Sequence, residues 1–203
     1  MSLARFLRDT RAAAAAEFAL IVPVMLLFLL GIIDVGMYTW RFNEAEKAAQ
    51  MGVRYAVVTN QVASALRTTT YVGTTCSGTA ITAGDPICAS ALGKVTCGSS
   101  GSCVCTTAPC PALTRDSAAF DNIAARVRAI APWIRTTSIK VEYSGSGLGY
   151  AGDPTIAMAP IVTVKLENMN IRPMSGFVFG ASFGLPTIIR SLTMEDGRGT
   201  RAN

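Results

Sequence analysis

An apolar run near the N-terminus constrains this chain more than any other feature. Residues 12–33 read AAAAAEFALIVPVMLLFLLGII, and Glu17 is the one charged residue among them. A helix needs about 20 apolar residues to cross the hydrocarbon core of a bilayer, so the run is long enough to span a membrane. An ionised carboxylate in lipid is costly unless it meets a partner. The sequence therefore predicts a transmembrane helix in which Glu17 has a specific function.

The residues before the run predict its orientation. Arg5, Arg8 and Arg11 precede it against a single acidic residue, Asp9. Positive charge favours the cytoplasmic side, so we expect a cytoplasmic N-terminus and an exported remainder. A cleaved secretory signal would have a shorter apolar core and a small-residue cleavage site at its end, which this run lacks. A plain signal anchor is the simplest alternative, but it gives the carboxylate no role.

The helix is predicted to continue beyond the apolar run. Residues 34–58 contain no proline, and small or apolar residues recur there at helical spacing. These residues are Met37, Trp40, Ala45, Ala48, Gly52, Tyr55 and Ala56. We expect one helix over residues 13–58, about 70 Å long, with a transmembrane half at 13–33 and an amphipathic half at 34–58.

The segment 59–113 differs in composition from the rest of the chain. It is rich in Thr, Ser and Gly and holds all six cysteines: Cys76, Cys88, Cys97, Cys103, Cys105 and Cys110. An exported compartment is oxidising, so we expect disulfides that staple a loop excursion. Cys103 and Cys105 are too close to bond each other, but the sequence leaves the choice among 15 pairings open. Metal or redox chemistry is the alternative, and the CxxC spacing typical of it is missing.

The residues that follow predict an α+β head over 114–195. Asp116 and Ser117 favour a helix start, and apolar residues at helical spacing predict a helix over 117–131. Three strands are expected after it, at residues 139–143, 161–166 and 187–194. The economical arrangement is a small antiparallel sheet that buries one face against the long helix and the second helix.

Two further segments lie in the C-terminal part. Residues 171–186 read IRPMSGFVFGASFGLP, which is unusually apolar for a connection between strands. Either this segment folds over the sheet as part of the core, or it forms an exposed apolar patch for a neighbouring subunit or the membrane surface. Residues 196–203 are mostly polar and are expected to form a frayed tail.

The composition argues against an enzyme. The chain has no histidine, which excludes Ser-His-Asp, Cys-His and HExxH sites. Glu44 and Glu46 face different ways on a helix, and the glycine-rich turn 145–149 has no P-loop lysine. The net charge is +5, but no basic cluster or nucleic-acid-binding motif accompanies it. We expect no catalytic residue, cofactor, metal, nucleic acid or small-molecule substrate.

Three stretches of the N-terminal part together resemble a known family. Residues 11–23 read RAAAAAEFALIVP, residues 26–36 form an apolar stretch that ends in GIIDVG, and residues 43–56 read NEAEKAAQMGVRYA. In combination they resemble the start of the TadE-like minor pseudopilins of the bacterial tight-adherence (Tad/Flp) pilus system. The resemblance covers residues 11–58 and implies a pilin-like shape, with a long N-terminal helix on a small head.

The resemblance also implies a processing site and an assembly site. A prepilin peptidase would cleave between Ala12 and Ala13 and remove residues 1–12 as a leader. The family usually has glycine before the cut, where this chain has Ala12. Cleavage exposes a cationic amine on Ala13, and the carboxylate of Glu17, followed by Phe18 in the same motif, would meet such an amine on a neighbouring subunit.

The expected function is therefore structural: biogenesis of a Tad/Flp-type pilus, with roles in secretion and cell adhesion. Expected partners are other pilins or pseudopilins, the inner-membrane assembly machinery and a prepilin peptidase. The protein would cross the bacterial inner membrane once and place its head in the periplasm. The alternative is a membrane-anchored periplasmic binding or adhesion module whose disulfide-stapled loop recognises a surface. The sequence leaves open whether the subunit enters the fibre or stays at its base.

Overall fold

The computed structural model describes residues 10–110, 113–153, 157–176, 180 and 182–199. The chain folds into two compact units. The smaller one, called the helical unit below, consists of Met1–Phe42 and Asn170–Gly184. The larger one, called the head, consists of Asn43–Met169 and Leu185–Asn203.

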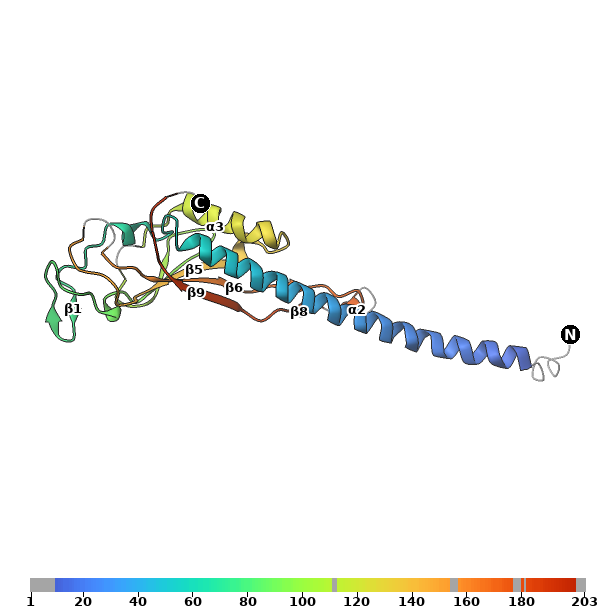
Figure 1. The fold of residues 1–203 in the computed structure, drawn as a ribbon. Helices are drawn as coiled ribbons and strands as arrows, with labels where there is room; N and C mark the ends of the chain where they lie inside the picture. Colours follow the sequence, from blue (N-terminus) through green and yellow to red (C-terminus); the bar gives the residue numbers. More distant parts are fainter. Residues whose placement is uncertain (1–9, 111–112, 154–156, 177–179, 181, 200–203) are drawn as a thin grey trace. The chain divides into compact units, whose positions relative to one another are not determined.

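Helix α2 (Thr10–Ala56) is a single helix of 47 residues (Figure 1). It begins three residues before the predicted start and ends two residues before the predicted end at residue 58. Within the head its buried side is formed by small residues: Ala45, Ala48, Ala49, Gly52, Val53 and Ala56. Small side chains let neighbouring elements approach the helix closely, which is how this short stretch contributes to a core.

One residue of the predicted apolar stripe lies elsewhere. Trp40 was expected on the packed side of the helix, but 72% of its surface is exposed. The buried stripe in the head begins at Ala45, because Trp40 precedes the residues that belong to the head.

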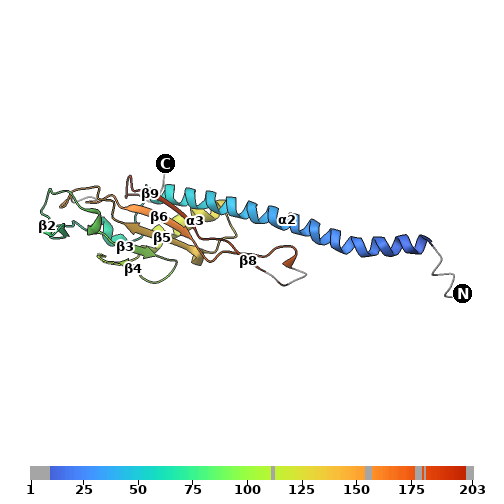
Figure 2. The same cartoon turned by 90° about the horizontal axis from the view of Figure 1, so that it is seen from below.

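The centre of the head is a five-stranded antiparallel sheet (Figure 2). Its strands are β3 (Lys94–Cys97), β4 (Val104–Thr107), β5 (Ile139–Ser144), β6 (Ile161–Leu166) and β9 (Ile188–Thr193). Their order in the sheet is β4-β3-β5-β6-β9. Three of them, β5, β6 and β9, are the strands that the alternation of apolar residues predicts.

The other two strands come from the cysteine-rich segment, which was expected to lie outside the core. β3 pairs with β5 in register from Lys94↔Ser144 to Cys97↔Val141, and β4 adds the edge. Val95 and Cys97 are fully buried, so part of this segment belongs to the core after all. A four-residue strand with two apolar side chains is too short a pattern to be recognised in a Thr- and Ser-rich sequence.

Helix α3 (Ser117–Ile130) agrees with the second predicted helix. The Asp116 side chain caps it by accepting a hydrogen bond from the backbone N–H of Ala119 at 3.0 Å. Its buried side consists of Ala119, Phe120, Ile123, Ala124 and Val127. The predicted fold class is confirmed: a long N-terminal helix and a second helix accompany an antiparallel sheet.

The remaining elements are short. Strands β1 (Thr75–Cys76) and β2 (Thr79–Ala80) pair with each other, as do β7 (Asn170–Ile171) and β8 (Phe183–Gly184). Three 3-10 helices are η1 (Ser64–Arg67), η2 (Ala89–Ala91) and η3 (Thr136–Ser138).

Candidate assembly site

The N-terminal part of α2 carries a long exposed apolar surface. Large apolar side chains that are at least 45% exposed are Phe18, Leu20, Ile21, Val24, Met25, Leu26, Leu27, Phe28, Leu29, Ile32, Ile33 and Val35. Among the described residues, this helix is the one that is long and apolar enough to cross a membrane. None of its most apolar window is buried within the chain. Such a surface requires lipid or other subunits to cover it.

The residues of the predicted processing site lie in the same helix. Ala12 and Ala13 are helical, and the structure describes only their backbone. Glu17 is exposed and follows Ala13 by four residues, so both positions lie on the same side of the helix, about 6 Å apart along its axis. Phe18 is 70% exposed. The structure therefore places a carboxylate at one end of the exposed apolar surface.

A second acidic residue, Asp34, lies near the other end of the apolar surface. The carboxylate of Asp34 accepts hydrogen bonds from the backbone N–H groups of Met174 at 2.5 Å and of Ser175 at 2.9 Å. Sequence reasoning missed this role of Asp34. Its position directly after the apolar run was an available signal, because an acidic residue there needs a partner.

These hydrogen bonds attach the described part of the segment 171–186 to α2, a contact that the sequence did not predict. The described part of the segment forms a small hairpin, with Asn170 opposite Gly184, and its turn is bonded to α2. Folding over the sheet, the first alternative for this segment, stays a prediction, because the sheet belongs to the other unit. Leu185, just after the hairpin, is buried in the head. Phe177, Val178 and Phe179 lie outside the described residues.

The six cysteines form three disulfides. The pairs are Cys76–Cys88, Cys97–Cys103 and Cys105–Cys110. Disulfide formation and the absence of a Cys103–Cys105 bond agree with the sequence, which left the pairing open. Each bond joins a cysteine to the next cysteine along the chain, and the two lie 12, 6 and 5 residues apart, so each bond closes a small loop.

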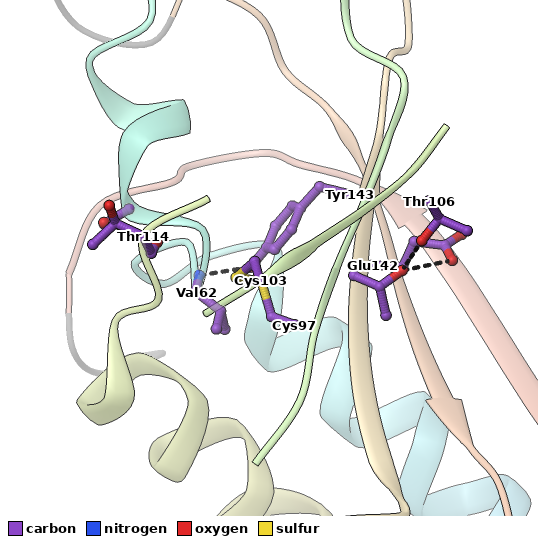
Figure 3. The surroundings of a disulfide bond; sticks show 9 residues. Val62, Cys97, Cys103, Thr106, Thr114, Glu142 and Tyr143 are labelled. Carbon is purple, nitrogen blue, oxygen red and sulfur yellow. Dashed lines mark hydrogen bonds between the residues drawn. A yellow bond between two sulfur atoms is a disulfide. The ribbon is translucent and has the colours of Figure 1, made fainter. Parts of the chain in front are cut away.

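The Cys97–Cys103 bond lies in the core of the head (Figure 3). Close to it, the hydroxyl of Tyr143 accepts a hydrogen bond from the backbone N–H of Val62 at 2.8 Å. Tyr143 is completely buried, and this desolvation raises the pKa of its hydroxyl far above the ordinary value of 10.0. The disulfide and the tyrosine are thus parts of one buried structural cluster.

Glu142 points to the opposite face of the sheet from Tyr143 (Figure 3). It is only 5% exposed, and two lysines of the neighbouring strands neutralise it. Lys165 Nζ lies 2.7 Å and Lys94 Nζ 3.6 Å from its carboxylate oxygens. Thr96 Oγ1 donates a further hydrogen bond at 3.3 Å. These contacts compensate the buried charge of Glu142. They are sufficient to explain this carboxylate as a structural residue.

The two glutamates of α2 in the head also have structural partners. Trp133 Nε1 donates a hydrogen bond to Glu44 Oε2 at 2.6 Å. Glu46 forms an ion pair with Arg190 of β9. The two carboxylates therefore tie α2 to different parts of the head, as expected for residues that face different ways.

The comparisons with known proteins concern the N-terminal part of the chain. Residues 12–54 match the family model described as TadE-like protein, which confirms the predicted resemblance over this segment. Neither a curated protein nor a solved structure matches the chain. A TadE-like segment suggests a protein associated with the Tad pilus, in a structural or assembly role. The matched residues contain Glu17, Asp34 and the exposed apolar surface between them.

Proposed function

We propose that this protein is a minor pseudopilin required for biogenesis of a Tad/Flp-type pilus, and that it is not an enzyme. It is inserted once in the bacterial inner membrane, with a cytoplasmic N-terminus and a periplasmic head. A prepilin peptidase cleaves it between Ala12 and Ala13. The mature helix then packs against other pilins or pseudopilins and the assembly machinery, with Glu17 paired to the N-terminal amine of a neighbour.

One observation carries this proposal. An exposed carboxylate, Glu17, lies at the end of an apolar helix surface that is left uncovered by the part of the chain that the structure describes, within the segment that matches the TadE-like family. Apolar side chains alone give helices in lipid little reason to choose one partner over another. A buried charge pair makes the choice of partner helix specific, because each charge is neutralised only when the carboxylate and the amine meet.

The energetics of such a pair favour a strong effect of substitution. Coulomb attraction in a low-dielectric environment offsets the desolvation of the two charges when both are present. Removing one partner leaves the other buried and unpaired, at a cost of about 3–5 kcal/mol. This corresponds to roughly two to four decades in an association constant.

The decisive experiment is complementation of a deletion strain with Glu17→Leu. We expect this variant to insert in the membrane but to fail in pilus production. Glu17→Asp should give an intermediate pilus yield, because its shorter side chain reaches the amine less well. Glu195→Leu is the matched control: it removes an exposed glutamate of the head and should leave the pilus yield unchanged.

A plain membrane anchor makes the opposite prediction. Without a paired partner, Glu17 only opposes insertion, so Glu17→Leu should insert at least as well as the wild type and support full piliation. Full piliation by Glu17→Leu at normal expression would therefore contradict the proposal.

The alternative function, a membrane-anchored binding or adhesion module, is favoured by exposed apolar side chains on the surface of the head, in strand β4 and in the segment after β5. Val104, Leu148 and Tyr150 are 63%, 57% and 64% exposed. Under this alternative, polar substitutions such as Val104→Ser or Tyr150→Ser abolish surface attachment, whereas Glu17→Leu does not. Counting pili and attached cells for the same set of strains separates the two functions.

A further inference from the structure

We propose that the hairpin at residues 170–176 and 182–184, called the clamped hairpin below, binds phospholipid at the periplasmic surface of the membrane. The helical unit then contacts the bilayer twice: α2 spans it, and the clamped hairpin lies on its interface. This inference rests on the membrane insertion that the proposed function requires.

The position of the clamped hairpin along the helix is the first argument. Asp34 directly follows the apolar run at 12–33, so it marks the level at which α2 leaves the hydrocarbon core. Its carboxylate holds the backbone N–H groups of Met174 and Ser175. The turn of the hairpin is therefore fixed at the depth of the lipid headgroups.

The exposed side chains of the clamped hairpin are the second argument. Met174 is 54% and Phe183 52% exposed, where a turn in water would present polar groups. The whole stretch from 170 to 184 contains no acidic residue and one basic residue, the exposed Arg172. Apolar side chains next to a lone cation suit an interface with anionic phospholipids.

The space between the clamped hairpin and α2 is the third argument. An open groove of about 500 Å³ lies there, lined by Gly31, Asp34, Val35, Tyr38, Ser175 and Phe183, together with Gly184. Gly31 and Val35 also line a second apolar depression on α2, which continues down the transmembrane surface. A groove that is continuous with the lipid-facing surface is filled by an acyl chain rather than by water.

Aromatic side chains on α2 agree with this depth. Tyr38 is half-buried against the groove, and Trp40 is 72% exposed two residues later. Tyrosine and tryptophan are enriched at membrane interfaces because their rings are apolar and their polar atoms remain hydrated. The exposure of Trp40, which the helical pattern alone did not explain, follows from this position.

The test measures the depth of labelled residues in liposomes of phosphatidylcholine and phosphatidylglycerol, using the full chain. The six native cysteines are all in disulfides, so an environment-sensitive thiol fluorophore (NBD) reacts only with an introduced cysteine. The test positions are Met174→Cys and Phe183→Cys. Leu27→Cys in the transmembrane run and Leu148→Cys in the head are the matched controls.

We expect quenching of Met174→Cys and Phe183→Cys by lipids that carry a quencher just below the headgroup. Leu27→Cys should be quenched by a quencher deep in the acyl chains, and Leu148→Cys by neither. Adding Asp34→Ala should release the clamped hairpin, so Phe183→Cys then loses its lipid quenching while Leu27→Cys keeps it.

Three results would overturn the inference, and they differ in what they say of the proposed function. If Leu27→Cys is quenched but the hairpin labels stay in water, the anchor stands and the lipid contact is lost. If the hairpin labels are shielded from water without lipid quenching, a neighbouring subunit covers them instead. If Leu27→Cys is not quenched either, membrane insertion fails and the proposed function fails with it.

Discussion

At the scale of single residues, Tyr143 shows how burial makes the head depend on pH. Its ring is fully buried, so the ionised hydroxyl would lose its solvation by water, and the hydrogen bond from the N–H of Val62 offsets only part of that loss. Tyr71 is 5% exposed, and its burial raises the pKa of its hydroxyl to about 12. In the unfolded chain both hydroxyls ionise near pH 10. Folding therefore favours the neutral form of both groups.

We predict that the head loses stability in alkaline solution. The stabilisation by a raised pKa is fully present below the unfolded value near 10 and is lost as the pH rises toward the folded value. The free energy of unfolding should fall by about 1.4 kcal/mol per pH unit for each of the two tyrosines above pH 10. Urea unfolding in detergent micelles, followed by the fluorescence of the half-buried Trp133, measures this dependence.

The matched controls for this prediction are two phenylalanine variants. Tyr143→Phe should remove one tyrosine's share of the pH dependence, whereas Tyr150→Phe, at a position that is 64% exposed, should keep the wild-type slope. A wild-type slope in Tyr143→Phe would show that Tyr143 is not protected from ionisation in the folded head.

At the scale of elements, the contact between α2 and α3 depends on Gly52. A Cβ on this residue would lie 2.6 Å from Val127 Cγ2 and 3.6 Å from Val164 Cγ1, so α2, α3 and β6 meet at this point. In most helix positions glycine is about 1 kcal/mol worse than alanine. Its presence here follows from the space that the packing leaves.

We predict that Gly52→Ala destabilises the head despite its better helix propensity. Overpacking of this kind costs about 1–3 kcal/mol, which exceeds the propensity gain in most of that range. Gly36→Ala is the control in the same helix, because a Cβ there meets nothing within 4 Å and should cause no loss. In the double variant Gly52→Ala/Val127→Ala, the new methyl group occupies freed space, so the double loss should be smaller than the sum of the single losses. Additive losses in urea unfolding would contradict the contact.

The three disulfides differ in their surroundings. Cys97 and Cys103 are buried in the core, whereas Cys105 is exposed and Cys110 half-buried at the sheet edge. A reductant must reach a sulfur atom to react with it, so accessibility controls the order of reduction in the folded state.

We predict that reduction under native conditions opens Cys105–Cys110 before Cys97–Cys103. Increasing amounts of a phosphine reductant, followed by alkylation and peptide mass spectrometry, should label Cys105 and Cys110 first. Cys97 and Cys103 should be labelled only where the head unfolds. Removing a disulfide of this loop size costs about 2–3 kcal/mol, so Cys97→Ser/Cys103→Ser should lower the urea midpoint. Early labelling of Cys97 would show that the cluster around Tyr143 is open to solvent.

At the scale of the whole molecule, the proposed maturation changes the end of α2. The chain before cleavage carries Arg5, Arg8 and Arg11, and the mature chain would instead begin with the amine of Ala13. The amine and Glu17 then belong to the same end of the apolar surface, which is what an intersubunit charge pair requires.

We predict that the mature protein begins at Ala13. Replacing Ala12 by leucine should block the small-residue position of the cut and leave residues 1–12 attached. Intact-mass analysis of membrane-extracted protein, from cells with and without the prepilin peptidase, distinguishes the two forms. Wild-type protein that keeps residues 1–12 in piliated cells would contradict the processing step.

The sequence alone determined the features that depend on local pattern. The apolar run at residues 12–33 predicted the membrane-length helix, because so many apolar side chains in succession need lipid or other subunits to cover them. Alternation of apolar residues located β5, β6 and β9, and Asp116 with the apolar spacing after it located α3. The TadE-like motif is equally local, because its residues are neighbours along α2.

Only the tertiary structure decided the features that join distant residues. Asp34 meets Met174 across 140 residues of chain, and Tyr143 meets Val62 across 81. The cysteine pairing depends on the β3–β4 hairpin, whose pattern is too short to be recognised before its pairing with β5 is known. Local sequence sets what each segment favours, but a hydrogen bond or disulfide forms only where the packed core brings its two atoms together.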